Sequence, residues 1–355
     1  MDIARLRSER MRSHRLTAPA GSVVDAAAHL TATQGQEFWG GRWALAVRAK
    51  GDATLSDVDA AFESGDLVRS WTQRGTLHIL PAVDLAWMLQ VTAERQSKQY
   101  APIHRSLGIE PTHLDTAERA VRTALRGGHR VTRTEFAEVL RGAGLETAGM
   151  RGNHILSALA LRGVIVLGPV VARDAGPTRD QYLVAVDEWV SSPSAPRDPL
   201  AEMLVRYLRG HAPAGLADFS WWAGLPKGMA RQALESAGDR IVEVEEGLFA
   251  VAGPSPSPSP LPVPSTVALP PFEEYYLSYA DRSVPCAPEF MRAIGPSMNG
   301  IVRPVIVRDG EIVGAWAHSI AVGKHHLPPV PELFANAPAD EVDAALARFS
   351  RFITS

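Results

Sequence analysis

Cysteine, lysine and long hydrophobic runs are all scarce in this sequence. The only cysteine, Cys286, can form neither an internal disulfide nor a cysteine-based zinc site, which excludes disulfide-rich secreted scaffolds and fits a reducing cytoplasm. The most apolar stretch, residues 155–171, is interrupted by Arg162, and the N-terminus is charged where an export signal would be apolar. We therefore expect a cytoplasmic protein with no export signal and no membrane span.

The charge balance does not by itself indicate a nucleic-acid partner. The chain has 36 basic and 39 acidic residues and a net charge of −3, whereas domains that bind nucleic acid tend to be basic. Nearly all basic residues are arginines, which suit bidentate phosphate contacts, although GC-rich coding gives the same bias without any function. Residues 1–15 hold five arginines against Asp2 and Glu9. A near-neutral total can therefore conceal a basic face.

Signatures of several enzyme classes are missing. The sequence contains no HExxH, GxSxG or CxxC motif, no Walker loop, and no GxGxxG after an expected strand. The histidines are scattered except for the pair His325-His326, which has no carboxylate or cysteine at ligand spacing. We therefore expect no metal and no nucleotide cofactor.

The length and one proline-rich segment divide the chain. A chain of 355 residues exceeds the usual limit for a single core, so at least two domains are expected. Proline occupies every second position from Pro254 to Pro264, which excludes a helix or a central strand. The segment 254–265 is predicted to be a polyproline linker of up to roughly 40 Å, at about 3.1 Å per residue. A proline-rich ligand for a signalling domain is the less favoured alternative.

Before this linker, one local order recurs, in which short helices precede two strands joined by a turn. The clearest copy begins with an amphipathic helix over 199–209, with Leu200, Leu204 and Leu208 on one face. It continues with helices 216–223 and 226–237 and strands 240–244 and 248–251. The middle copy has helices 114–126, 132–141 and 153–162 and strands 164–167 and 181–186. The first copy has helices 23–33, 39–48 and 55–64 and strands 67–72 and 76–80. This order is typical of winged helix-turn-helix units, here predicted at 1–103, 104–195 and 196–253.

The last 90 residues differ from the rest. Strands are expected over 302–307 and 312–316 on either side of Asp309-Gly310, a dipeptide that favours a tight hairpin turn. A final helix is expected over 339–349. The fold class is therefore α+β, with three tandem winged helices followed by a small β-rich C-terminal domain at 266–355. Winged helices bind DNA grooves, but they also serve as protein-interaction modules.

Five stretches resemble one known family. They are residues 33–37 (Thr-Gln-Gly-Gln-Glu), 70–81, 219–225, 269–275 and 279–283. In this order they resemble the AlkZ/YcaQ superfamily of winged-helix DNA glycosylases. The resemblance implies three tandem winged helices and a β-rich domain around a concave DNA channel, and excision of alkylated bases, including N7-alkylguanines joined in interstrand crosslinks. Some members protect producers of DNA-alkylating natural products, so self-resistance is a further implied role.

The family's catalytic Gln-x-Gln motif matches Gln34 and Gln36, with Gly35 at a middle position that is typically apolar. An N7-alkylated guanine is cationic and already a good leaving group, so a neutral glutamine carbonyl that orients the water is sufficient. We assign this role to Gln36 and a supporting role to Gln34. Glu37 lies one position too far for the motif. No lysine lies within the Gln34-Gly35-Gln36 motif, which predicts a monofunctional glycosylase without Schiff-base chemistry.

The expected partner is double-stranded DNA carrying alkylated purines, bound by a monomer in the nucleoid. A crosslinked base cannot swing out freely, so an open channel is expected in place of the usual closed pocket. Candidate DNA-binding residues are Arg10, Arg12, Arg15, Trp39, Arg42, Arg74, Lys324, His325 and His326. Trp43 and Trp71 are instead predicted to lie in the core. A non-catalytic winged-helix DNA-binding protein or regulator remains the alternative.

Overall fold

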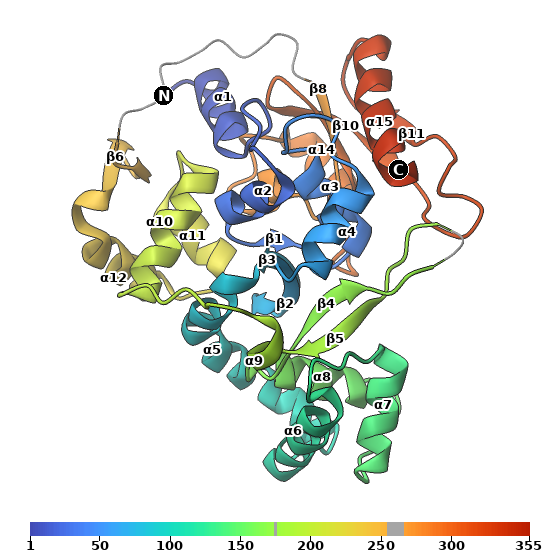
Figure 1. Ribbon diagram of the computed structural model, residues 1–355. Coiled ribbons are helices and arrows are strands. Elements are labelled where there is room, and N and C mark those ends of the chain that lie inside the picture. The colour runs from blue at the N-terminus through green and yellow to red at the C-terminus, as the bar shows by residue number, and fades with distance from the viewer. Residues whose placement is uncertain (174–175, 254–265) are drawn as a thin grey trace. The chain divides into compact units, whose positions relative to one another are not determined.

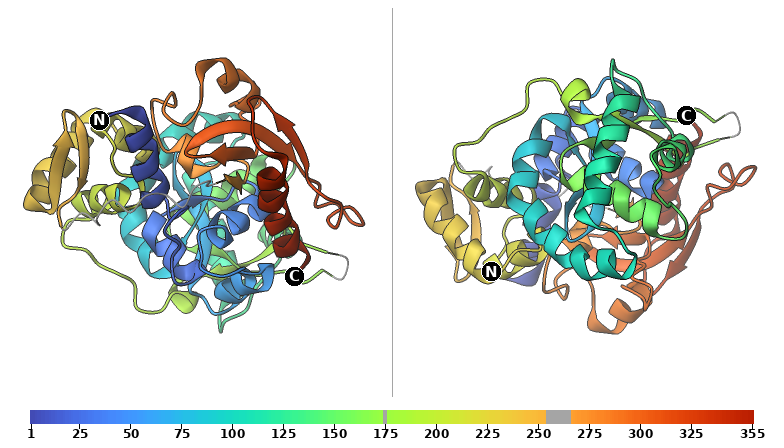
Figure 2. Two further views of the ribbon diagram at one scale, coloured as in Figure 1. Left: turned by 90° about the horizontal axis from the view of Figure 1, so that it is seen from above. Right: turned by 90° about the horizontal axis from the view of Figure 1, so that it is seen from below.

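A computed structural model describes residues 1–173, 176–253 and 266–355 (Figures 1 and 2). The predicted polyproline linker therefore lies outside the described residues, as does part of the turn after residue 172. The chain forms two compact units. Unit 1 comprises Met1–Val58, Arg173–Pro177 and Leu200–Ser355, and unit 2 comprises Asp59–Ala172 and Thr178–Pro199. No helix in the described part of the chain is both long enough and apolar enough to cross a membrane.

Unit 2 is built around four antiparallel strands in the order β3-β2-β4-β5. Their bounds are β2 (Leu67–Gln73), β3 (Thr76–Pro81), β4 (Ile165–Val170) and β5 (Gln181–Ala185). Every residue of β2 is buried, as expected of a strand covered on both faces. The helices are η1 (Ala82–Asp84), α5 (Leu85–Ser106), α6 (Pro111–Leu125), α7 (Arg133–Gly142), α8 (Arg151–Leu161) and α9 (Val186–Trp189). Helices α5 and α8 both pack on β2.

The first part of unit 1 contains α1 (Ile3–Ser13), α2 (Val23–Leu30), the short strand β1 (Thr33–Gln34) and α3 (Phe38–Ala46). Asp2 and Ser22 accept backbone N–H groups at the starts of α1 and α2, which fixes where these helices begin. Helix α2 ends because Thr31 takes a positive φ of 71°. Helix α4 (Leu55–Glu63) follows at the boundary between the units.

After unit 2 the chain returns to unit 1. The elements here are α10 (Pro199–His211), α11 (Leu216–Ala223), α12 (Lys227–Ala237), η2 (Gly238–Arg240), β6 (Ile241–Glu245) and β7 (Leu248–Val251). Strands β6 and β7 form a separate two-stranded antiparallel hairpin. A bridge between Ala214 and Phe249 joins the loop before α11 to this hairpin.

The C-terminal part of unit 1 is a four-stranded antiparallel sheet in the order β11-β10-β9-β8. Its elements are β8 (Thr266–Leu269), α13 (Glu274–Leu277), α14 (Pro288–Ile294), β9 (Val305–Arg308), β10 (Glu311–Ala317), β11 (Val330–Leu333) and α15 (Ala339–Thr354). Helix α15 packs on β8 and on α3, so the two ends of the chain share one core (Figure 1). Asp309 and Gly310 both take positive φ, as a tight hairpin turn of the expected type requires.

Most expected helices and strands are confirmed, and three differences are informative. The helix expected over 23–33 ends at Leu30, which leaves the motif in an extended segment. The strand expected from Val302 begins at Val305. The helix α5, 22 residues long, was not expected at all. Its Pro102 lies inside the helix and weakened the helical pattern of the sequence.

Candidate active site

The Gln34-Gly35-Gln36 motif lies between the end of α2 and the start of α3. Gln34 closes the short strand β1 and is only 8% exposed. Gly35 is buried and Gln36 is exposed, so the two glutamines occupy different environments within one loop. Glu37 precedes α3, and its side chain makes no capping hydrogen bond there. The exposed Gln36 is thus the motif residue that a macromolecular substrate can reach.

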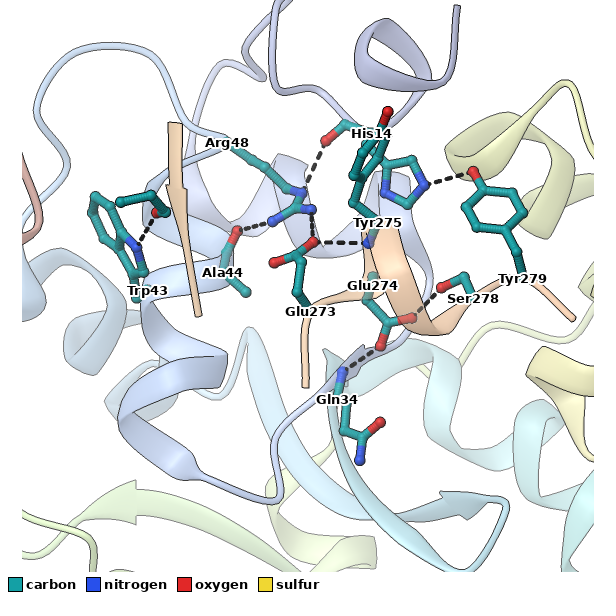
Figure 3. Close-up of polar contacts among 11 residues, drawn as sticks. His14, Gln34, Trp43, Ala44, Arg48, Glu273, Glu274, Tyr275, Ser278 and Tyr279 are labelled. Atoms are coloured by element: carbon teal, nitrogen blue, oxygen red, sulfur yellow. Dashed lines mark hydrogen bonds and ion pairs between the residues drawn. The ribbon is translucent and has the colours of Figure 1, made fainter. Parts of the chain in front are cut away.

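A buried carboxylate holds the start of this loop. The backbone N–H of Gln34 donates to Oε1 of Glu274 over 2.7 Å, although the two residues are 240 positions apart in the sequence. The hydroxyl of Ser278 donates to Oε2 of the same carboxylate. Glu274 is 1% exposed. In Figure 3 the side-chain amide of Gln34 points away from Glu274, so the carboxylate fixes the backbone and leaves the amide directed elsewhere.

The carboxylate of Glu273, next to Glu274, holds the C-terminal end of α3. Arg48, two residues beyond α3, is fully buried and forms an ion pair with Glu273. Its Nε donates to the carbonyl of His14 over 2.9 Å, and its Nη1 donates to the carbonyl of Ala44 over 2.9 Å (Figure 3). Glu273 and Glu274 therefore contact the chain after and before α3, and together they fix the segment from Gln34 to Arg48. Breaking a buried pair of this kind leaves an uncompensated charge, which is strongly destabilising.

The buried side chain of His14 lies next to this network, since the His14 carbonyl accepts from Arg48. The Tyr279 hydroxyl donates to the carbonyl of His211 over 2.8 Å, so it accepts from Nε2 of His14, which lies 2.8 Å away. His14 is therefore the tautomer with its proton on Nε2, and its buried Nδ1 has no hydrogen-bond partner among the described residues. Burial, reinforced by nearby His211 and Arg48, holds the pKa of His14 well below its ordinary value.

The buried histidines predict acid sensitivity. Burial and the nearby Arg15 lower the pKa of His29 to about 4 from an ordinary value of 6.5, and burial likewise lowers the pKa of His14 and His78. The unfolded chain therefore binds protons that the folded chain does not, and stability is lost as pH falls from 6.5 towards 4. For His29 the loss amounts to about 2 kcal/mol at pH 5. We expect the melting temperature to fall steadily between pH 7 and pH 5.

Differential scanning calorimetry checks this expectation, with His29→Gln as the test variant and His129→Gln as the control. Glutamine can still donate to the Ser13 carbonyl that His29 contacts over 2.7 Å, but it does not titrate. The pH dependence should weaken in His29→Gln and persist in His129→Gln, because His129 is exposed. A melting temperature that is flat or rises towards pH 5 would contradict the assignment.

The structure divides the candidate DNA-binding residues into two groups. Arg12, Arg15, Arg74 and His325 are partly exposed, and Lys324 and His326 are exposed. Lys324, His325 and His326 lie together in the turn between β10 and β11, and Arg12 and Arg15 lie together at the end of α1. Arg74 lies in unit 2, at the turn between β2 and β3. Arg10, Trp39 and Arg42 are buried instead.

The three buried residues have structural contacts that account for their positions. The Arg10 guanidinium lies 3.8 Å from the centre of the Tyr279 ring, and its Nε donates to the carbonyl of Pro213 over 3.0 Å. The Arg42 guanidinium lies 4.3 Å from the centre of the Phe38 ring. Trp39 packs in an aromatic cluster, with ring centres 5.6 Å from Phe349 and 6.0 Å from Trp316. In this conformation these three side chains belong to the core of unit 1 and offer no surface to DNA.

Two further tryptophans were expected in the core. Trp43 and Trp71 are buried, at 1% and 6% exposure, which confirms their placement in the core. Within residues 1–173, 176–253 and 266–355, no three His, Cys, Asp or Glu side chains gather in a way that could hold a metal ion.

Sequence reasoning did not find the residues that hold the loop. Glu273 and Glu274 fall within the stretch 269–275, whose resemblance was noted without a role for either carboxylate. The available signal was that this acidic pair directly follows the apolar segment 267–272. Acidic side chains are rarely buried, so a pair of them next to a core segment is unusual. Nothing in the local pattern connects that pair to Gln34.

Comparisons with known proteins agree with the family resemblance. The family described as DNA glycosylase AlkZ-like matches residues 27–352. An interstrand DNA cross-link repair glycosylase from Streptomyces sahachiroi is 27% identical over 268 residues, which cover 70% of this chain and 70% of that protein. The solved structure of the Streptomyces sahachiroi DNA glycosylase AlkZ shares the fold, with a TM-score of 0.78 at 22% identity, over 99% of this chain and 98% of that one. The chain therefore belongs to the AlkZ-like DNA glycosylase family.

Proposed function

We propose that this protein is a monofunctional DNA glycosylase that hydrolyses the N-glycosidic bond of cationic N7-alkylated purines. The observation that carries the proposal is the Gln34-Gly35-Gln36 loop, which presents Gln36 at the surface while Glu274 holds the backbone of Gln34. Membership of a DNA glycosylase family supports the reaction class. The neutral character of both glutamines supports a substrate that is already activated by its positive charge.

In the proposed mechanism the C1′–N9 bond breaks first, and its electron pair neutralises the cationic base. The sugar passes through an oxocarbenium-like state, which the partial negative charge of the Gln36 carbonyl stabilises. That carbonyl also accepts a hydrogen bond from the water whose oxygen adds to C1′, and the proton is released to solvent. Gln34 supports the water or the adjacent backbone, and Glu274 acts as a positioning residue through the N–H of Gln34.

The proposed substrate is duplex DNA, bound by a monomer through three winged helices and the C-terminal domain, which together form a channel. The proposed contacts are the surface cations Arg74, Lys324, His325 and His326. Arg12 and Arg15 instead line a separate cavity at the end of α1. Action on interstrand crosslinks is supported by the similarity to the Streptomyces sahachiroi interstrand DNA cross-link repair glycosylase. Self-resistance to a DNA-alkylating natural product and association with the nucleoid complete the proposal.

The test is incubation of the full chain with a duplex that carries a single N7-methylguanine, beside a matched duplex with unmodified guanine. We expect free N7-methylguanine and an uncleaved abasic strand from the first duplex and no base from the second. Heating in alkali breaks the strand at each abasic site, so the fraction of broken strands measures base release, and mass spectrometry identifies the base. Tight, salt-dependent binding of both duplexes without base release would instead identify the non-catalytic DNA-binding protein.

A further inference from the structure

Unit 1 contains a cavity of about 500 Å³ away from the Gln34-Gly35-Gln36 loop. It is lined by the end of α1, by α2 and α10, and by the β6–β7 hairpin, none of which carries a residue of the loop. In both views of Figure 2 the dark blue α1 lies next to the yellow segment that holds α10 and the hairpin. A volume of this size is typical of sites for small molecules.

One side of the cavity is cationic. Arg12 and Arg15 come from the end of α1, and Arg209 comes from the end of α10. The acidic residue in the lining, Glu9, forms an ion pair with Arg5 over 2.9 Å. Three guanidinium groups around one cavity favour an anionic group, because arginine donates paired hydrogen bonds to carboxylate, sulfonate or phosphate oxygens.

Arg15 is the most unusual of the three arginines. Its backbone takes a positive φ of 59°, which is strained for a residue with a side chain. Its Nε is buried and has no hydrogen-bond partner in the described part of the chain, and its Nη1 contacts the Ala18 carbonyl only at 3.4 Å. Strained residues with unsatisfied donors cluster at ligand sites, where a bound group satisfies them.

The part of the lining that comes from the β6–β7 hairpin is apolar. Val242 and Val244 project from the same face of β6 and are 46% and 44% exposed, which is unusual for valines. No Phe, Tyr or Trp side chain lines the cavity among the described residues, so a nucleobase would find none of the large rings on which bases usually stack. A backbone phosphate of DNA needs cations at an open surface and gains nothing from a valine wall.

We propose that this cavity binds a small organic anion, whose acidic group contacts Arg15 and Arg209 while its apolar body packs against Val242 and Val244. The site is separate from the glycosylase loop, and the proposal does not depend on the reaction assigned to that loop. His29 lines the same cavity, and its lowered pKa keeps it neutral, so the arginines alone supply the positive charge.

The probe for this site is 8-anilinonaphthalene-1-sulfonate, a fluorescent anion with an apolar body. We expect saturable binding of one probe per chain. Arg15→Gln and Arg209→Gln should each raise the dissociation constant about tenfold, the effect of losing one charge-assisted hydrogen bond. Val244→Asp should abolish binding, because it places a charged, hydrated carboxylate against the apolar body of the probe. Arg231→Gln and Val330→Asp are the matched controls, since both residues are exposed outside the cavity and should leave binding unchanged.

Two results would overturn the proposal. Unchanged probe binding in Arg15→Gln and Arg209→Gln would show that the dye binds elsewhere. Displacement of the probe by a short unmodified duplex would assign these arginines to the DNA backbone instead. Retention of the probe in the presence of saturating duplex supports a separate site for an organic anion. Thermal melting of each variant confirms that the fold is kept before binding is compared.

Discussion

Replacing Glu274 with alanine should lower the single-turnover release of N7-methylguanine by about 100-fold, the cost of misplacing a reacting group by roughly 1 Å. Glu274 accepts the N–H of Gln34 over 2.7 Å and thereby fixes the backbone from which the glutamine loop departs. Glu274→Gln should retain most of the rate, because an amide oxygen can accept the same N–H. The measurement is single-turnover base release at saturating enzyme, with duplex affinity recorded in parallel.

Alanine at position 274 will also destabilise the fold, so a control must separate the two effects. Ser278→Ala removes the hydrogen bond from the Ser278 hydroxyl to the same carboxylate without touching Gln34. Loss of a hydrogen bond to a buried carboxylate costs about 1–3 kcal/mol. We expect Ser278→Ala to share the loss of stability and to keep the rate of base release. If Ser278→Ala and Glu274→Ala lose rate equally at equal stability, Glu274 has no specific positioning role.

The second large effect is expected at Gln36. Removing its carbonyl in Gln36→Ala should slow base release by about 10²- to 10⁴-fold, the usual contribution of a group that assists proton transfer from the attacking water. Gln36→Asp should instead widen the range of bases that are released, because a carboxylate stabilises an oxocarbenium-like sugar more strongly than an amide does. We therefore expect Gln36→Asp to release a neutral base such as hypoxanthine, which the parent protein leaves in place.

Glu37→Gln is the matched control for this series. Glu37 is adjacent to Gln36 and carries the charge that Gln36 lacks, and its side chain makes no capping hydrogen bond at α3. Its replacement should leave the release of N7-methylguanine unchanged. A large loss in Glu37→Gln with little effect in Gln36→Ala would move the catalytic role to the carboxylate. Chromatography of released bases from duplexes that carry either lesion provides the measurement.

Local sequence patterns were sufficient for many elements of the fold. Thr132 and Glu135 form the expected capping box at the start of α7, and Asp309-Gly310 forms the expected turn between β9 and β10. Both features depend on residues within four positions of each other, so their energetics are contained in a short window. The motif at Gln34 and Gln36 was likewise found from a short stretch, through its resemblance to a family.

Long-range contacts could not be read from such windows. The bond between Gln34 and Glu274 joins two residues 240 positions apart, and no periodicity in either segment reports it. The same limit explains Arg10, Trp39 and Arg42, which were candidate DNA-binding residues and are buried. An arginine in a helix is usually solvated, and only tertiary packing supplies the Tyr279 ring that covers Arg10. The Phe38 ring beside Arg42 lies four residues earlier in α3, but the burial of the whole helix in the core is again a tertiary effect.

The central claim is that two neutral glutamines on one loop carry out hydrolysis of a cationic base. It is tested most directly by single-turnover release of N7-methylguanine from saturating duplex, with the parent protein compared with the double variant Gln34→Ala/Gln36→Ala. Residues that act as a unit are not additive, so the double variant should lose about as much rate as Gln36→Ala alone, with duplex affinity unchanged. Retention of the parent rate by the double variant would contradict the claim.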